Sequence, residues 1–175
     1  MPVSGSSAHT RVLTAKHGLE ILVRPLRDGD ERTVTDVFDR LGDESRRKRF
    51  NGPKPSLGEM ELRWLAGVDS RRHALVAYVG GDPRPVAIAR LVRTGSSAEI
   101  AFEVADEYQR RGIGAALTAE LIADARAARI TEITAIVSTE NQAAVALLRR
   151  VLRVLDIRLV GPELSIRAPL AAPSL

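Results

Sequence analysis

Two glycines between a strand-like and a helix-like segment constrain the fold of this chain more than any other feature. They lie in the stretch Gln109–Gly114, which reads Gln-Arg-Arg-Gly-Ile-Gly. Residues 98–104 before it are strand-like, and residues 115–121 after it are small and apolar, as in a buried helix. Glycine lets the backbone approach an anion closely, and the unpaired N–H groups of a first helical turn attract negative charge. The stretch therefore predicts a strand–loop–helix unit that holds a pyrophosphate, with two arginines beside it.

Two common nucleotide-binding motifs do not match this stretch. No Gly-Lys-Ser/Thr follows the loop, so it is not a Walker loop. A dinucleotide fingerprint starting at Gly112 would need a third glycine where the chain has Leu117. A glycine turn that serves packing alone remains an alternative to an anion site.

Composition bounds the class of protein. The chain has 175 residues, 45% of them hydrophobic, which suits one domain with an aliphatic core. Aromatic residues make up only 3% of the chain, so an aromatic platform for single-stranded nucleic acid is not expected. Cysteine is absent, which excludes a disulfide and a cysteine nucleophile. With three histidines and no cysteine, a metal site is not expected either. The net charge of +4 suits an anionic ligand without selecting one. No signal-like or membrane-spanning apolar run occurs, so the sequence predicts a soluble cytoplasmic protein without a membrane partner.

Patterns along the chain predict a mixed α/β sheet with helices on both faces. Residues 1–18 are expected to form a flexible leader, and residues 169–175 a tail. Between them, the expected strands are 19–25, 74–79, 86–92, 98–104, 133–137, 154–160 and 164–168, and the expected helices are 28–41, 44–50, 56–67, 112–128 and 141–150.

The loop and the order of elements resemble the GNAT superfamily of N-acetyltransferases, over residues 19–168. Segments 23–26, 41–50 and 68–77 are most similar to the acetyltransferase domain of bacterial protein-lysine acetyltransferases. The resemblance implies the acyl-CoA N-acyltransferase fold, acetyl-CoA as the acyl donor and no metal. It assigns coenzyme A binding to the loop residues Gln109, Arg110, Arg111, Gly112, Ile113, Gly114 and Ala115.

Acyl transfer to an amine needs a general base. A lysine with a pKa near 10.4 is neutral in only about one molecule in a thousand at pH 7.4, equivalent to about 4 kcal/mol. Glu99 and Glu103 lie on one side of the strand that enters the loop, because strand residues alternate with a period of two. Either glutamate can act as the general base, or both can be ordinary surface carboxylates. The resemblance places the catalytic glutamate near the start of this strand, which favours Glu99 over Glu103.

The resemblance also implies that the strand itself holds the pantetheine arm through backbone groups near Phe102 and Val104, whose side chains can still belong to the core. Asn141 at the start of the following helix is a favoured N-cap residue, and the resemblance makes it a ligand candidate as well. Leu148 occupies the position where many members carry a tyrosine that protonates the thiolate. Water or Tyr78 are the alternatives to that tyrosine.

These observations lead to one expected function. The chain is an acetyl-CoA-dependent enzyme that transfers acetyl directly to a primary amine, with protein lysine as the first candidate acceptor. A small-molecule amine acetyltransferase and a coenzyme A binding regulatory domain with little turnover are the alternatives. The basic run Arg46–Arg49 is either a solvated helix face or a contact for an acidic partner or a coenzyme phosphate. No nucleic-acid motif supports a nucleic-acid partner, and a homodimer is left open.

Overall fold

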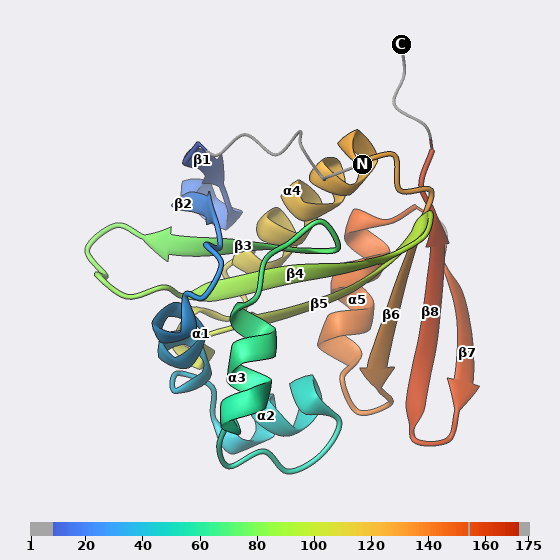
Figure 1. The fold of residues 1–175 in the computed structure, drawn as a ribbon, viewed down its shortest axis with the longest axis horizontal. Helices are drawn as coiled ribbons and strands as arrows, with labels where there is room; N and C mark the ends of the chain where they lie inside the picture. Colours follow the sequence, from blue (N-terminus) through green and yellow to red (C-terminus); the bar gives the residue numbers. More distant parts are fainter. Residues whose placement is uncertain (1–8, 154, 172–175) are drawn as a thin grey trace.

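An eight-stranded mixed sheet forms the centre of the protein (Figure 1). The computed structural model describes residues 9–153 and 155–171. In these residues the strand order is β1-β2-β3-β4-β5-β6-β8-β7, and all neighbours are antiparallel except β5 and β6. The strands are β1 (Arg11–Thr14), β2 (Glu20–Pro25), β3 (Arg72–Val79), β4 (Ala87–Thr94), β5 (Ser97–Val104), β6 (Glu132–Ser138), β7 (Asp156–Val160) and β8 (Glu163–Pro169).

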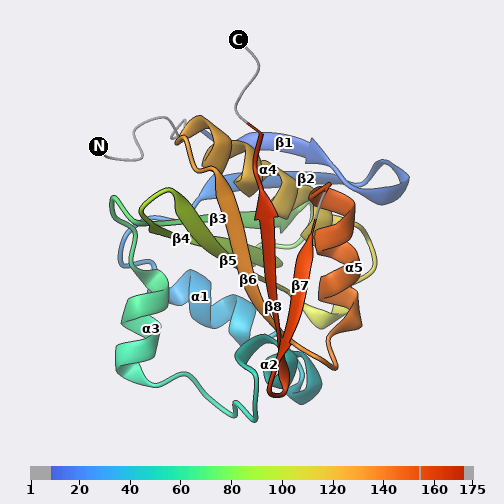
Figure 2. The ribbon, with the colours of Figure 1, turned by 90° about the vertical axis from the view of Figure 1, so that its right-hand side faces the viewer.

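Helices cover both faces of this sheet (Figures 1 and 2). Strand β4 shows the division, because Ala87, Ala89 and Leu91 pack with one set of helices while Ile88 packs with the other. We call the side of Ile88 the front face and the opposite side the rear face. The front face carries α1 (Glu31–Phe38), α2 (Asp43–Phe50) and α3 (Glu59–Ala66), and the rear face carries α4 (Ile113–Ala127) and α5 (Gln142–Val151).

The parallel pair β5–β6 opens the sheet at its centre. A parallel connection needs a long crossover, which α4 supplies between these two strands. Three residue pairs join the strands, and the last of them is Glu99 with Thr134. Beyond that pair β5 continues to Val104 and β6 to Ser138 without pairing to each other. The two strands therefore diverge, and the gap between them positions the site described below.

The predicted mixed α/β sheet with helices on both faces is confirmed, and each predicted element within residues 19–168 is present with shifts of a few residues at its ends. Asp30 caps α1, since its side chain accepts a hydrogen bond from the Thr33 N–H at 3.4 Å. No helix in the described residues is long and apolar enough for a membrane crossing. The same residues contain no cluster of His, Cys, Asp and Glu side chains suited to a metal ion.

The predicted ends of the domain need two corrections. Within the expected leader 1–18, Arg11–Thr14 forms an edge strand, which at four residues is too short to show a clear periodicity. Arg11 ties this strand to α4 through Glu120 and Asp124. Within the expected tail 169–175, Leu170 is buried and its N–H donates to the Thr131 carbonyl at 2.8 Å. Residues 1–8 and 172–175, and residue 154 at the start of one predicted strand, lie outside the described residues.

Candidate active site

The glycine loop has the backbone geometry that an anion requires. Gly112 caps α4 with a φ of 80°, and Arg110 before it has a φ of 64°, so both lie in the left-handed region. Within the described chain, no backbone group accepts a hydrogen bond from the amides of residues 110–115, and the first bonded amide is Ala116, which donates to the Gly112 carbonyl at 3.1 Å. A run of unpaired N–H groups at a helix start favours negative charge.

Packing requires the same glycines. A Cβ on Gly112 would lie 2.9 Å from the backbone nitrogen of Lys16, and a Cβ on Gly114 would lie 3.0 Å from Leu147 and 3.2 Å from Val104. The backbone nitrogen of Lys16 also donates to the Arg111 carbonyl at 3.1 Å. Packing and anion binding are therefore compatible at this loop, because side-chain volume and backbone amides are separate properties.

Arg40, a buried residue that no sequence motif indicated, supports the loop through two ion pairs. Arg40 follows α1, its side chain is 4% exposed, and it pairs with Asp82 at 2.6 Å and with Glu107. The hydroxyl of Tyr108 donates to the same Asp82 carboxylate at 2.9 Å. The hydrogen bond from Arg40 holds the pKa of Asp82 well below its usual value, and the bond to Asp82 raises the pKa of Tyr108. This network anchors the segment between β5 and the glycines.

A cavity of about 550 Å³ runs from this loop through the gap between β5 and β6. Residues from both faces of the sheet line it. On the front, β5 contributes Glu99, Ala101 and Glu103, and α2 contributes Lys48 and Arg49. On the rear, the lining comes from the loop, the start of α4 and one side of α5. The cavity therefore extends from one face of the sheet to the other at this gap.

Glu99 lies at the closed end of the gap. It forms the last pair with Thr134 of β6 and is opposite Val92 of β4. The residue is exposed and lines the cavity from the front face. Its carboxylate is therefore accessible to a molecule that enters the cavity from that face.

Glu103 differs from Glu99 in burial and in its partners. Its side chain is 5% exposed and pairs with Arg49 of α2 and, at 3.1 Å, with Arg90 of β4. Burial by itself raises the pKa of Glu103, but the positive charges of Arg49 and Arg90 outweigh burial, so the pKa lies below its usual value. Arg90 also donates to the Leu65 carbonyl at 2.7 Å. Glu103 thereby links β5 to α2, and through Arg90 to α3.

The backbone of β5 presents polar groups to the gap. In an antiparallel pair, alternate residues direct their N–H and C=O groups away from the partner strand. The N–H of Ala105 bonds to Val86 on the β4 side, so the groups of Phe102 and Val104 point toward the gap. The Val104 carbonyl accepts a hydrogen bond from the Gln109 side-chain amide at 3.0 Å. Both predicted strand residues therefore offer backbone groups inside the cavity.

Of the three remaining candidates, Asn141, Leu148 and Tyr78, only Asn141 lines the cavity. Asn141 caps α5, accepting from the Ala144 N–H at 3.1 Å, and it also lines the cavity. Leu148 is fully buried and does not line the cavity. Tyr78 lies outside the cavity lining as well, with its hydroxyl accepting a hydrogen bond from Arg24 at 2.8 Å. Neither position supplies a proton donor to the cavity.

The arginines of the sequence motifs are divided among several partners. In α2, Arg46 lies over the Phe38 ring, Arg47 pairs with Glu140, and Lys48 pairs with Glu44. The basic run is therefore not a uniform solvated face. Arg111 lies over the Tyr108 ring, 5.1 Å from its centroid, and unlike the other predicted loop residues it does not line the cavity.

The cavity thus collects most of the predicted residues, and it adds Lys16 and Arg150, which no motif indicated. Together with Arg49 of the basic run, these two residues bring positive charge from segments far apart in sequence. The predicted residues that line it are Glu99, Phe102, Glu103, Val104, Gln109, Arg110, Gly112, Ile113, Gly114, Ala115 and Asn141.

A mixed sheet that opens between two parallel strands, with a helix start and a carboxylate along one cavity, agrees with the expected α/β acyltransferase fold. Comparison with known proteins gives the family. Residues 38–152 match the Acetyltransferase (GNAT) family, and the chain belongs to it. The family to which it belongs is one of acetyltransferases that use acetyl-CoA.

Two relatives and one solved structure show which members of the family this chain is similar to. The chain is 36% identical over 126 residues to Acetyltransferase Pat of Mycolicibacterium smegmatis, covering 69% of this chain but 37% of that protein. It is 31% identical over 131 residues to Acetyltransferase PA5475 of Pseudomonas aeruginosa, covering 72% of this chain and 70% of that protein. The GNAT domain of S. lividans PAT has the same fold, with a TM-score of 0.83 and 24% identity over 92% of this chain and 97% of that one. The resemblance inferred from the motifs is thereby confirmed.

Proposed function

We propose that this protein transfers acetyl from acetyl-CoA directly to a primary amine, with a protein lysine as the acceptor. The observation that carries the proposal is the cavity through the sheet. It joins the amides of residues 110–115, which donate to no backbone group in the described part of the chain, to the Glu99 carboxylate at the closed end of the gap. Donor and acceptor can then meet inside the gap while approaching from opposite faces.

Coenzyme A fits the rear part of this cavity. The loop amides and the nearby Lys16 and Arg110 provide the donors and positive charge that a pyrophosphate requires. From Val104 to Glu99 the strand spans about 17 Å, at about 3.3 Å per residue, which leaves room for an extended pantetheine arm. Phe102 and Val104 would pair with its amides, and Asn141 would reach the same arm from α5.

Glu99 is the proposed general base. The acceptor must lose a proton before it attacks the thioester carbon, and Glu99 is the accessible carboxylate on the acceptor side. Glu103 is a poor alternative, because each of its oxygens bonds an arginine and its pKa is lowered. The proton would pass to Glu99 directly or through a water molecule, and the amine would then displace the thiolate.

The departing thiolate needs no dedicated acid in this scheme. A thiol with a pKa of about 8.5 is a fair leaving group near neutrality, and water can protonate it later. Transfer is direct because the chain contains no cysteine nucleophile. Fully buried Leu148, however, also favours a second candidate function, a coenzyme A binding domain with little turnover.

Thiol release from acetyl-CoA tests the proposal. We expect release with at least one acceptor from a panel of proteins and small amines, and a fall of about 100-fold or more in kcat for Glu99→Gln, because general-base catalysis is worth that much. Acetyl-CoA affinity should be unchanged in that variant. Glu20→Gln, which alters an exposed carboxylate on another strand outside the cavity lining, is the matched control.

Two outcomes would contradict parts of the proposal. Full activity of Glu99→Gln would remove Glu99 from the mechanism. Tight coenzyme A binding without release from any acceptor would favour the binding domain.

A further inference from the structure

The front face of the sheet carries a continuous row of side chains beside Glu99. Strand pairing places Arg72, Val92, Glu99 and Thr134 in register across β3, β4, β5 and β6. Directly opposite residues have Cβ atoms about 4.5–5.5 Å apart, so Val92 is an immediate neighbour of Glu99. An acceptor whose amine reaches Glu99 must place its adjoining atoms on this row or against the helices that border it.

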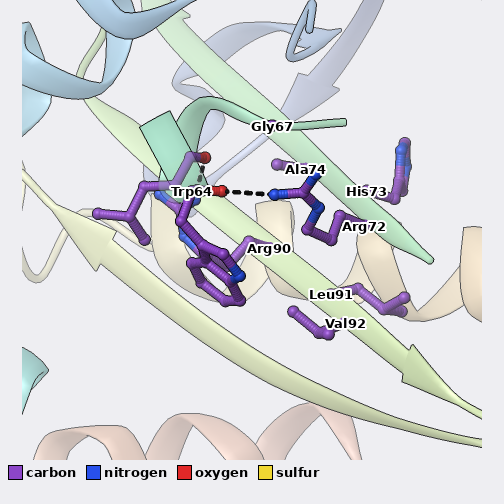
Figure 3. A pocket seen from close by; sticks show the side chains of 9 residues that line it. Trp64, Gly67, Arg72, His73, Ala74, Arg90, Leu91 and Val92 are labelled. Carbon is purple, nitrogen blue, oxygen red and sulfur yellow. Dashed lines mark hydrogen bonds between the residues drawn. The ribbon is translucent and has the colours of Figure 1, made fainter. Parts of the chain in front are cut away.

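Helix α3 borders the row with an exposed aromatic side chain. Trp64 and Val92 line one small pocket together with Arg72 and Arg90, and Figure 3 shows the indole beside Arg90 with Val92 further along the strand. The Trp64 carbonyl accepts a hydrogen bond from Arg72 at 3.1 Å, which fixes this end of α3 to β3. The indole is thereby held next to the row that contains Glu99.

The exposed residues of α3 are not needed for its packing. Leu65 and Ala66 are buried and join α3 to the front core, whereas Trp64 is 50% exposed and Met60 is 83% exposed. Residues four apart lie on the same side of a helix, so Met60 and Trp64 form one exposed apolar strip. Trp and Met are enriched at protein interfaces, and Trp is enriched at their energetic centres as well.

We propose that Met60, Trp64 and Val92 form a docking surface for the polypeptide that flanks an acceptor lysine. The inference rests on the proposed function and selects its substrate class, a lysine within a peptide or protein and not a free small amine. The argument is that the surface is continuous with the site, because Val92 lies opposite Glu99 and lines a small pocket together with Trp64. On the other side of the same opening, α2 carries Lys48 and Arg49. A segment that reaches Glu99 therefore lies between this apolar surface and α2, where Lys48 pairs with Glu44 and Arg49 with Glu103.

Geometry sets the spacing of the recognised residue. Val92, which lines a small pocket together with Trp64, lies opposite Glu99 on the next strand, and neighbouring strands are about 4.8 Å apart. An extended peptide advances about 3.3 Å per residue. An apolar side chain two or three residues from the acceptor lysine can therefore contact Trp64 while the lysine amine reaches Glu99.

Fluorescence tests docking without any turnover. Trp64 is the chain's single tryptophan, so its emission reports directly on this surface. The probes are two nine-residue peptides with one central lysine, one with leucine three residues from it and one with alanine there. Titrated into protein saturated with coenzyme A, the leucine peptide should shift the emission to shorter wavelength and bind about tenfold tighter than the alanine peptide. Equal binding of the two peptides, or an unchanged emission, would overturn the inference.

Kinetics supply a second, independent measurement. In Trp64→Ala the KM for the leucine peptide should rise about tenfold, while the KM values for acetyl-CoA and for lysine methyl ester stay the same. Trp64→Phe should retain most of the peptide preference. Leu159→Ala, which removes an exposed side chain from distant β7, is the matched control. Acetylation of peptides by Trp64→Ala at the wild-type efficiency would refute docking and leave the proposed transfer intact, whereas failure of every amine would refute the transfer itself.

Discussion

Glu99 and Glu103 show how two equivalent positions on one strand acquire different properties. Both are on the front side of β5, but only Glu103 faces Arg49 and Arg90. The sequence indicated their common side, because strand periodicity is local. It did not indicate the arginines, since one comes from α2 and the other from β4. Their charge makes Glu103 a structural ion-pair partner and leaves Glu99 as the proposed base.

Removal of the Glu103 carboxylate should destabilise the fold. Glu103→Gln leaves two arginines without their buried partner, which we expect to lower the free energy of unfolding by about 3 kcal/mol at pH 7. Urea denaturation measures this quantity. Glu20→Gln, an exposed change on β2, should lower it by less than about 0.5 kcal/mol. A Glu103→Gln variant as stable as the wild type would contradict this role.

The same variant should show a defined pH dependence. Because the folded-state pKa of Glu103 is lowered, its carboxylate stabilises the fold fully above the unfolded pKa of about 4.3. That contribution is lost as the pH falls from there through the folded-state pKa. The stability difference between wild type and Glu103→Gln should therefore be constant from about pH 6 to 8 and shrink below about pH 4. A difference that grows with acidification would show that the pKa is raised.

Among the elements of the fold, the glycine loop could be predicted from the sequence, but the residues that contact it could not. The strand, the two glycines and the apolar helix are adjacent in sequence, so local patterns indicate them. Lys16, which lies against Gly112, comes from a segment that was expected to form a leader. Arg40, which supports the loop through Asp82, is far from the glycines in sequence. Such contacts depend on the strand order, which periodicity does not specify.

Substitution at the first glycine should separate backbone strain from steric conflict. In Gly112→Ala the side chain must adopt a φ near 80° and also meet the Lys16 backbone, so we expect a loss of more than about 2 kcal/mol and weaker coenzyme A binding. Gly95→Ala is the matched control, since Gly95 also has a positive φ of 62° but open space around it. It should lose about 1–2 kcal/mol from strain alone and bind coenzyme A normally. Equal effects of the two changes would refute the steric role of Lys16.

In the molecule as a whole, the site exists because β5 and β6 diverge after three pairs. Helix α2 spans the front of the gap, pairing with β5 through Arg49–Glu103 and with the β6–α5 connection through Arg47–Glu140. The rear is bordered by α4 and α5. A ligand that fills the gap contacts elements from both halves of the sheet, so its binding energy should stabilise the whole domain.

Ligand binding should therefore raise the melting temperature of the complete domain. At a coenzyme A concentration of about 100 times Kd, a single site adds about 2.7 kcal/mol, which corresponds to about 5–10 °C for a domain of this size. A thermal scan with increasing coenzyme A measures the shift. Adenosine alone, which lacks the pyrophosphate, should produce a much smaller one. The absence of a shift with coenzyme A would contradict the assignment of the loop as its binding site.

Local patterns along the chain were sufficient for the order of elements between residues 19 and 168, the glycine loop and the family resemblance. Those properties depend on neighbouring residues, whose periodicity and turn chemistry are visible in the sequence. Tertiary contacts determine which carboxylate is paired, which arginine supports the loop, and that Trp64 lies beside the row containing Glu99. These depend on strand order and on the gap between β5 and β6, which bring together residues that the chain keeps far apart.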